Sequence, residues 1–162
     1  MKQIKVLLVR IALWLLGRAM CACAALDSRA HAEVRGWEDG VRIAMQVGPR
    51  GPAMALEKRG NRLRYLGATG VNSADLLIHF KHVDAALPVL LGMASVARGW
   101  AERRMTMKGD LTFAMSVVRV MFLVEAYLFP GLITRRIMQR VPAREVSMAR
   151  VYLSTLLAAH GR

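Results

Sequence analysis

Apolar and polar residues alternate with a period of two between positions 41 and 66. Residues 41–47 read V-R-I-A-M-Q-V and are followed by the turn sequence G-P-R-G-P, Met54 and Leu56 continue the alternation, and R-L-R-Y follows the turn R-G-N at 59–61. Side chains of a strand point to opposite faces in turn, so this pattern predicts strands joined by short turns. We expect an antiparallel meander over residues 41–66 whose exposed face carries the arginines.

Two shorter segments show the same alternation. Residues 76–80 (L-L-I-H-F) follow a loop rich in glycine, asparagine and serine, and residues 105–108 (M-T-M-K) precede Gly109-Asp110. These segments predict a fourth and a fifth strand, and the second face of the fourth is only partly polar.

Apolar residues at helical spacing predict two helices in the same region. Asp84 is a natural N-cap for a helix over residues 85–104, and Asp110 holds the equivalent position before a helix over residues 111–129. The second helix is apolar almost all round, and such a helix is buried on every side or embedded in lipid.

The first 25 residues combine Lys2 and Lys5 with an apolar run over residues 6–16 that Arg10 interrupts. They fit a cleaved signal peptide, a membrane-spanning helix, or a helix that lies in a membrane interface or packs on the domain. An arginine at the centre of an inserted helix costs about 2.5 to 3.5 kcal/mol, which favours the third interpretation. On a helical wheel, one side gathers the apolar residues Ile4, Leu8, Ile11 and Leu15.

Composition adds a strong positive charge to this apolar chain. Of its 162 residues 55% are hydrophobic, which excludes intrinsic disorder for most of the chain, and 24 Lys and Arg against 11 Asp and Glu give a net charge of +13. Such an excess favours phosphate-bearing partners, either nucleic acid or an anionic membrane. Cys21 and Cys23 are too close for a disulfide framework and too few for a zinc site.

The segment A-D-L-L-I-H-F at 74–80, an Ala- and Leu-rich helix, and W-A-E-R-R-M-T-M-K-G-D at 100–110 together resemble the sterol carrier protein domain, a non-specific lipid-transfer family. The resemblance covers residues 34–120 and agrees with the order of elements predicted above. More loosely, the chain resembles the lipid-binding accessory proteins of bacterial ubiquinone biosynthesis, which use the same domain. We therefore divide the chain into an N-terminal helix and linker (1–33), a lipid-binding domain (34–129) and a basic helical tail (130–162).

The resemblance implies an α+β fold: a curved, mostly antiparallel five-stranded sheet, backed by helices around an apolar tunnel that takes a sterol, fatty acyl or isoprenoid chain without catalysis. Extra helices are expected at both ends of the chain. The residues expected to line the tunnel are Leu76, Ile78, Phe80, Leu90, Leu91, Met93, Trp100, Met105, Met107, Phe113, Met115, Val118, Arg119 and Phe122. For each apolar member, ordinary core packing is the alternative.

Arg119 lies inside an apolar helix, where an unpaired charge is costly. Glu125 is nearly on the opposite side of that helix and cannot be its partner. Two interpretations stay open. Arg119 marks the tunnel mouth and meets a ligand carboxylate or headgroup, or it forms an ion pair with Asp84, Asp110 or Glu102.

The sequence offers little for catalysis or metal binding. His79 and His82 lie at a strand end without further ligands nearby, and we interpret them as surface histidines. The serines lack a nucleophile-elbow motif, and Asp110 directly before a helix is best explained as a cap. We predict no metal, no cofactor and no enzymatic activity.

We therefore expect a non-catalytic carrier of a hydrophobic lipid, cytoplasmic and peripheral on an anionic membrane, although a signal peptide or anchor stays open. The alternatives are a basic nucleic-acid-binding protein, which the dispersed arginines disfavour, and an accessory subunit of a membrane-associated complex. A homo-oligomer or a protein complex is a further option. The residues expected to contact the membrane are Lys2, Lys5, Arg10, Trp14, Arg135, Arg136, Arg140, Arg144 and Arg150.

Overall fold

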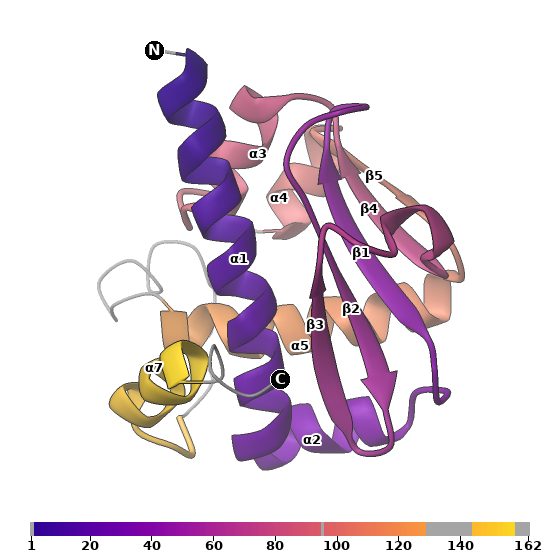
Figure 1. Ribbon diagram of the computed structural model, residues 1–162, viewed down its shortest axis with the longest axis vertical. Coiled ribbons are helices and arrows are strands. Elements are labelled where there is room, and N and C mark those ends of the chain that lie inside the picture. Colours follow the sequence, from indigo (N-terminus) through magenta and orange to yellow (C-terminus); the bar gives the residue numbers. More distant parts are fainter. Residues whose placement is uncertain (1, 95, 129–143, 158–162) are drawn as a thin grey trace.

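A five-stranded sheet is covered by the N-terminal helix, and the C-terminal helix packs on other helices, in the computed structural model, which describes residues 2–94, 96–128 and 144–157 (Figure 1). The predicted α+β class, with its terminal helices, is confirmed. The elements in chain order are α1 (Lys2–Leu26), α2 (Ser28–Arg35), β1 (Arg42–Val47), β2 (Ala53–Arg59), β3 (Arg62–Gly67), the 3-10 helix η1 (Val71–Ser73), β4 (Leu76–Phe80), α3 (Val83–Leu90), α4 (Val96–Ala101), β5 (Met105–Lys108), α5 (Leu111–Leu128) and α7 (Met148–Leu157).

The strands lie in the order β3-β2-β1-β4-β5. The predicted meander is confirmed as β1, β2 and β3, and the fourth and fifth strands begin and end where the alternation placed them. β4 runs parallel to β1, while the other neighbouring pairs are antiparallel. The connection between β3 and β4 passes over one face of the sheet, where Val71 of η1 packs on Ala44 and Ala55.

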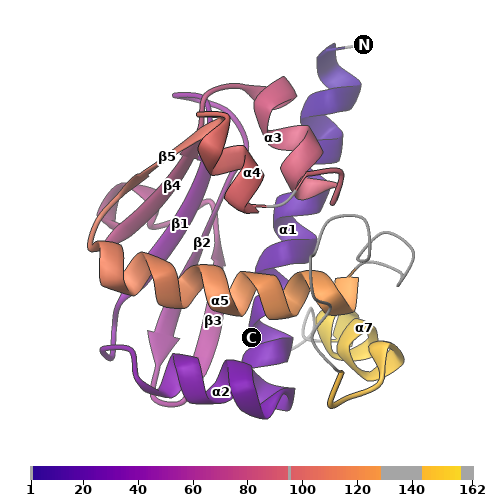
Figure 2. The same cartoon turned by 180° about the vertical axis from the view of Figure 1, so that it is seen from behind.

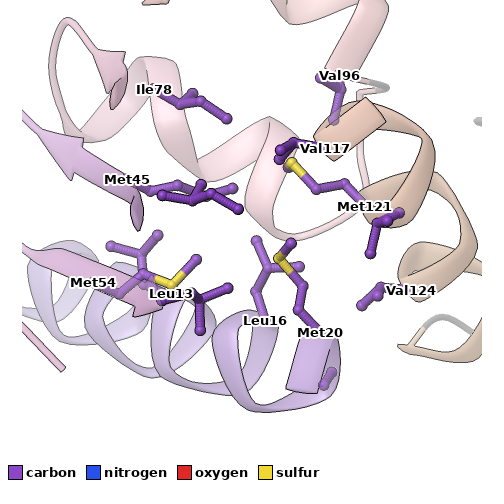
Figure 3. Close-up of a cluster of buried hydrophobic side chains, with 14 of the residues drawn as sticks. Leu13, Leu16, Met20, Met45, Met54, Ile78, Val96, Val117, Met121 and Val124 are labelled. Carbon is purple, nitrogen blue, oxygen red and sulfur yellow. The ribbon is translucent and has the colours of Figure 1, made fainter. Parts of the chain in front are cut away.

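The opposite face of the sheet carries the main hydrophobic core. Figure 3 shows Met45 of β1 and Met54 of β2 on one side of the cluster, Leu13 of α1 below them, and Val117 and Met121 of α5 across from the strands. All five side chains are buried. Figure 2 shows α5 running across this face of the sheet, so α1 and α5 together close the core.

The predicted helix over residues 85–104 is wrong in two respects. It is divided into α3 and α4, because Gly92 adopts a left-handed backbone conformation (φ +68°) that ends the first helix. Its N-cap is His82 rather than Asp84, since the His82 ring accepts a hydrogen bond from the Ala85 amide at 3.1 Å. Asp84 lies in the first turn instead and forms an ion pair with Lys5 of α1 at 2.6 Å.

The N-terminal segment is a helix packed on the domain. Val9, Leu13 and Met20 share one buried face of α1. Gly17 allows an unusually close approach, since a Cβ there would lie 2.6 Å from the Tyr65 ring. The helix is 25 residues long and so continues well beyond the apolar run noted in the sequence.

The C-terminal helix shares the same core. Val151 of α7 is buried in the cluster that contains residues of α1, α2, α5 and the sheet. The three predicted segments of the chain therefore do not have separate cores in the part that the structure describes. The outward face of α7 exposes Leu153, Leu156 and Leu157.

Two helices are long and apolar enough to cross a membrane, judged by length and composition alone. They are residues Gln3–Leu26, with mean hydropathy 1.9, and Leu111–Leu128, with mean hydropathy 1.7. Each also supplies a buried wall of the core, and the core helix of a water-soluble domain has the same character. Hydropathy alone is therefore weak support for a span in either helix.

Candidate binding groove

A groove with apolar walls lies between α1, α3 and α5, and we call it the α1–α3–α5 groove. It has a volume of about 170 Å³. Its lining comprises Leu8, Ile11, Ala12, Leu15 and Leu16 of α1, Val89, Leu90 and Leu91 at the end of α3, and Met121, Glu125 and Leu128 of α5. Among these lining residues, Glu125 alone has a polar side chain.

The groove exists because α1 is apolar on two faces. One face packs into the core, while on the other face Ile4, Leu8 and Ile11 are exposed and Leu15 is half-buried against the core. Ile4 is 63% exposed and Ile11 51% exposed, so this second face is largely free of protein contact. α3 and α5 cover only part of it, and the uncovered remainder continues the groove toward the N-terminal end of α1.

Among the described residues that line the groove, Glu125 alone is ionisable. Its side chain is 7% exposed, and within the described residues it makes no hydrogen bond and no ion pair. Burial raises the pKa of its carboxyl to about 7. Near neutral pH the protonated carboxyl is therefore well populated, and in that form it both donates and accepts hydrogen bonds.

Sequence reasoning considered Glu125 only as a partner for Arg119 and did not place it in a site. The available signal was a lone carboxylate on an apolar helix, which is costly unless the group is neutral or paired. The sequence did not show that Glu125 lies on the face of α5 that meets α1 and α3. The α1 side of the groove was visible, since three of its residues belong to the apolar stripe of the helical wheel.

A larger and more polar cavity of about 870 Å³ lies between α2, the loop that follows it and the first half of α5. Trp37 and Phe113 meet edge to face there, with ring centroids 5.3 Å apart. The Trp37 indole donates to Ser116 Oγ at 2.7 Å, and Ser116 in turn donates to Glu33. We call this the α2–α5 cavity. Phe113 was a predicted ligand contact, whereas Trp37 was missed because it stands alone in a polar stretch without periodicity.

Arg119 reaches the α2–α5 cavity and is paired with Glu33 of α2. The guanidinium donates to both carboxylate oxygens, at 2.7 and 3.1 Å. The hydrogen bond from Arg119 holds the pKa of Glu33 below its ordinary value, helped by Ser116. The pair links α2 to α5 across 86 positions of sequence.

An ion pair was one of the two predicted interpretations of Arg119, but all three suggested partners were wrong. Asp84 pairs with Lys5, and Glu102 pairs with Arg98 and Arg104. Asp110 caps α5 as predicted, accepting from the Phe113 amide at 2.6 Å. A ligand contact of Arg119 stays a prediction.

A third depression of about 380 Å³ runs along the outward side of α5. Its apolar wall comprises Met115, Val118, Phe122 and Leu123, and it adjoins the Arg119–Glu33 pair. Three of these residues were predicted ligand contacts. They thus lie on the side of α5 away from the sheet, whereas Leu90 and Leu91 lie in the α1–α3–α5 groove.

The other predicted ligand residues do not line any of these three cavities. Leu76, Ile78, Phe80 and Met105 are buried core residues, and Met107 packs at the edge of the core. Met93 and Trp100, which follow Gly92 in the sequence, are exposed. The predicted set is therefore divided among the core, the surface, the α1–α3–α5 groove and two adjoining cavities that share Arg119, rather than gathered around one tunnel. Which of its members contact lipid stays a prediction.

The structure describes the side chains of five of the nine predicted membrane-contact residues. Lys5, Arg10, Arg144 and Arg150 are exposed, and Arg144 donates to the Ala126 carbonyl at 2.9 Å. Trp14 is partly buried, and its ring lies 5.1 Å from the guanidinium of Arg18, which also faces Tyr65. The side chain of Lys2 and the residues Arg135, Arg136 and Arg140 lie outside the part that is described.

Within the described residues no group of three or more His, Cys, Asp or Glu side chains is arranged to hold a metal ion. His82 is engaged as the cap of α3, and His79 points to the face of β4 opposite Ile78. Cys21 and Cys23 are largely buried, which raises the pKa of each thiol to about 12.

Comparison with known proteins gives similarity to solved structures only. No family model and no curated protein matches the chain. A UbiJ-SCP2 ubiquinone synthesis protein is 16% identical with a TM-score of 0.47, and the match covers 74% of this chain and 96% of the other. Sterol carrier protein 2 from Yarrowia lipolytica, in its apo form, is 11% identical with a TM-score of 0.45 and coverage of 67% and 85%. Sterol carrier protein 2 like 2 from Aedes aegypti is 10% identical with a TM-score of 0.44 and coverage of 69% and 98%. At such identities the similarity assigns a role to no residue of this chain.

Proposed function

We propose that the protein binds a hydrophobic lipid without covalent chemistry and carries it at an anionic membrane surface. The observation that carries this proposal is the α1–α3–α5 groove, whose apolar walls continue onto the uncovered face of α1. It is also the function that the sequence resemblance implies.

Apolar burial supplies the driving force for binding. Each methylene group transferred from water to an apolar environment gains about 0.8 kcal/mol, so a long chain needs few directional contacts. Release requires a competing apolar solvent, and a bilayer is one. The uncovered face of α1, with Ile4, Leu7 and Ile11 all more than half exposed, offers an apolar surface that a bilayer could cover.

Charge favours an anionic membrane over a neutral one. The chain carries a net charge of +13, and each basic residue near an anionic surface contributes about 1 kcal/mol of attraction. Lys5 and Arg10 are exposed on the same half of α1 as the apolar face. Salt screens this attraction over about 8 Å at physiological ionic strength.

Lipid extraction and native mass spectrometry of freshly purified protein test the carrier function directly, and we expect a co-purifying lipid. Sedimentation with vesicles tests the membrane. Ile4→Ser combined with Ile11→Ser should weaken binding to anionic vesicles, whereas Leu153→Ser with Leu157→Ser on α7 is the matched control, since those leucines are equally exposed elsewhere. Truncation of α1 is unsuitable because Val9 and Leu13 belong to the core.

Two results would contradict the proposal. One is the absence of any bound lipid together with equal sedimentation of wild type and the α1 variant. The other is displacement from anionic vesicles by duplex DNA or RNA at equal phosphate concentration, which would assign the positive charge to nucleic acid instead.

A further inference from the structure

The α1–α3–α5 groove is not lined by apolar side chains alone, because Glu125 places a carboxyl group in its wall. The residue lies in the wall, is 7% exposed, and has no hydrogen-bond or ion-pair partner within the described part of the chain. A polar group that is largely removed from water without a partner costs up to about 1 to 3 kcal/mol. A ligand that satisfies this carboxyl would recover that cost on binding.

Among the described residues that line the groove, no charged side chain lies beside Glu125 to compensate its ionised form. The lining residues of α1, of the end of α3 and of α5 are otherwise aliphatic or methionine, and none of them titrates. Burial is accordingly the cause that raises the Glu125 pKa. The neutral carboxyl is thus the form that the groove favours.

The position of Glu125 also indicates how a lipid would be oriented. Glu125 lies among the buried residues Val89 and Met121, whereas Leu8 and Ile11 are exposed. The volume of about 170 Å³ is smaller than the 300 to 1,000 Å³ usual for a site that encloses a whole ligand. Only one end of a lipid therefore fits inside, and the rest must lie along the uncovered face of α1.

We infer that the α1–α3–α5 groove receives the polar end of a lipid whose polar group is an uncharged hydroxyl or carbonyl, hydrogen-bonded to Glu125, with its hydrocarbon directed along α1. This inference rests on the proposed function and adds to it the class of ligand and its orientation. A lipid carboxylate is disfavoured because it brings a negative charge into an apolar site whose described lining residues include no cation.

Competition binding with chains of equal length tests the ligand class. The protein is loaded with the neutral fluorophore N-phenyl-1-naphthylamine, and dodecanol, methyl dodecanoate, dodecanoate and dodecylamine are titrated as competitors at about pH 6 and about pH 8.5, on either side of the raised pKa. At the lower pH the alcohol and the ester should displace the fluorophore at least about tenfold more effectively than dodecanoate.

As the pH rises, the affinities of the two neutral competitors, dodecanol and methyl dodecanoate, should begin to differ. The ester only accepts hydrogen bonds, so it loses its partner when Glu125 gives up its proton. The alcohol can donate to the carboxylate instead, and its binding should change less. Glu125→Gln keeps a donor and should make ester binding independent of pH, while Glu38→Gln, the same change at an exposed glutamate outside the groove, should leave the wild-type pattern intact.

Glu125→Leu should bind the fluorophore but lose about tenfold in affinity for the alcohol. The inference is overturned if dodecanoate or dodecylamine binds best at about pH 6, or if the folded Glu125→Leu variant binds dodecanol as well as the wild type does at that pH. Failure of the proposed function looks different: neither the fluorophore nor any competitor binds the folded wild-type protein.

Discussion

The Tyr127 hydroxyl donates a hydrogen bond to the buried carboxylate of Asp27 at 2.6 Å and so joins the end of α5 to the start of α2. Asp27 is also the N-cap of α2, accepting from the Arg29 and Ala30 amides. The same hydroxyl accepts from the Glu145 amide at 3.1 Å. One phenol thereby connects α2, α5 and the segment that leads to α7.

Tyr127→Phe should lower the free energy of unfolding by about 1 to 3 kcal/mol, because it leaves the buried Asp27 carboxylate with one partner fewer. Urea unfolding followed by circular dichroism measures this. Tyr65→Phe is the control, since Tyr65 faces Arg18 with its ring, and the hydroxyl has no hydrogen-bond partner in the described chain. An equal loss in both variants would contradict the assignment.

The Tyr127→Phe variant should also differ from the wild type in the pH at which it unfolds in acid. Burial is the largest influence on the pKa of Asp27 and raises it, but the hydrogen bonds from Arg29, Tyr127 and Ala30 together hold it below its ordinary value. A lowered folded-state pKa stabilises the fold above the ordinary pKa, and this stabilisation is lost as the pH falls through the lowered value. Tyr127→Phe should therefore begin to unfold at a higher pH than the wild type in an acid titration.

Gly17→Ala should destabilise the protein although alanine is the better helix former. A Cβ at this position would lie 2.6 Å from the Tyr65 ring and 2.7 Å from the Met54 sulfur. Overpacking of this kind costs about 1 to 3 kcal/mol, against a gain of about 1 kcal/mol in helix propensity. Gly36→Ala, where the nearest atom is 3.5 Å away and φ is ordinary, should be neutral or stabilising in the same thermal unfolding measurement.

Glu125 should make the protein less stable as the pH rises toward neutrality. Its folded-state pKa of about 7 lies above its ordinary value of 4.5, so the folded state binds more protons between these values. The free energy of unfolding should fall by roughly 3 kcal/mol across that window and then level off. Glu125→Leu should remove this contribution, as urea unfolding at several pH values would show. If the free energy of unfolding depended on pH equally in Glu125→Leu and in the wild type, the prediction would be wrong and the Glu125 carboxyl would be solvated in the folded protein.

Lys58→Met should loosen the end of α2. The Lys58 ammonium is buried and donates to the carbonyls of Trp37 and, at 3.4 Å, Arg35, just where α2 stops. Removing this donor leaves carbonyls at a helix C-terminus without their cation and should cost about 1 to 3 kcal/mol. Trp37 fluorescence should shift as well, whereas Lys81→Met at an exposed lysine should change neither quantity.

The amino-acid sequence by itself determined the strands and the face of each that enters the main core. Alternation is a local property of the chain and places Ile43, Met45 and Val47 of β1 on one face, whereas the burial of Ala44 and Ala55 on the opposite face depends on η1. The same locality explains why the Asp110 cap was found. It also explains the error over residues 85–104, since the apolar spacing continues through Gly92 and does not show that the backbone turns left-handed there.

The tertiary structure decided everything that depends on which faces meet. Arg119 and Glu33 are 86 positions apart, and no local pattern could pair them. The apolar stripe of α1 was visible in the sequence, but only the crossing of α1, α3 and α5 showed that it lines a groove while a different face enters the core. The burial of Glu125 has the same origin, because it is a property of the assembled groove walls and not of the helix that carries the residue.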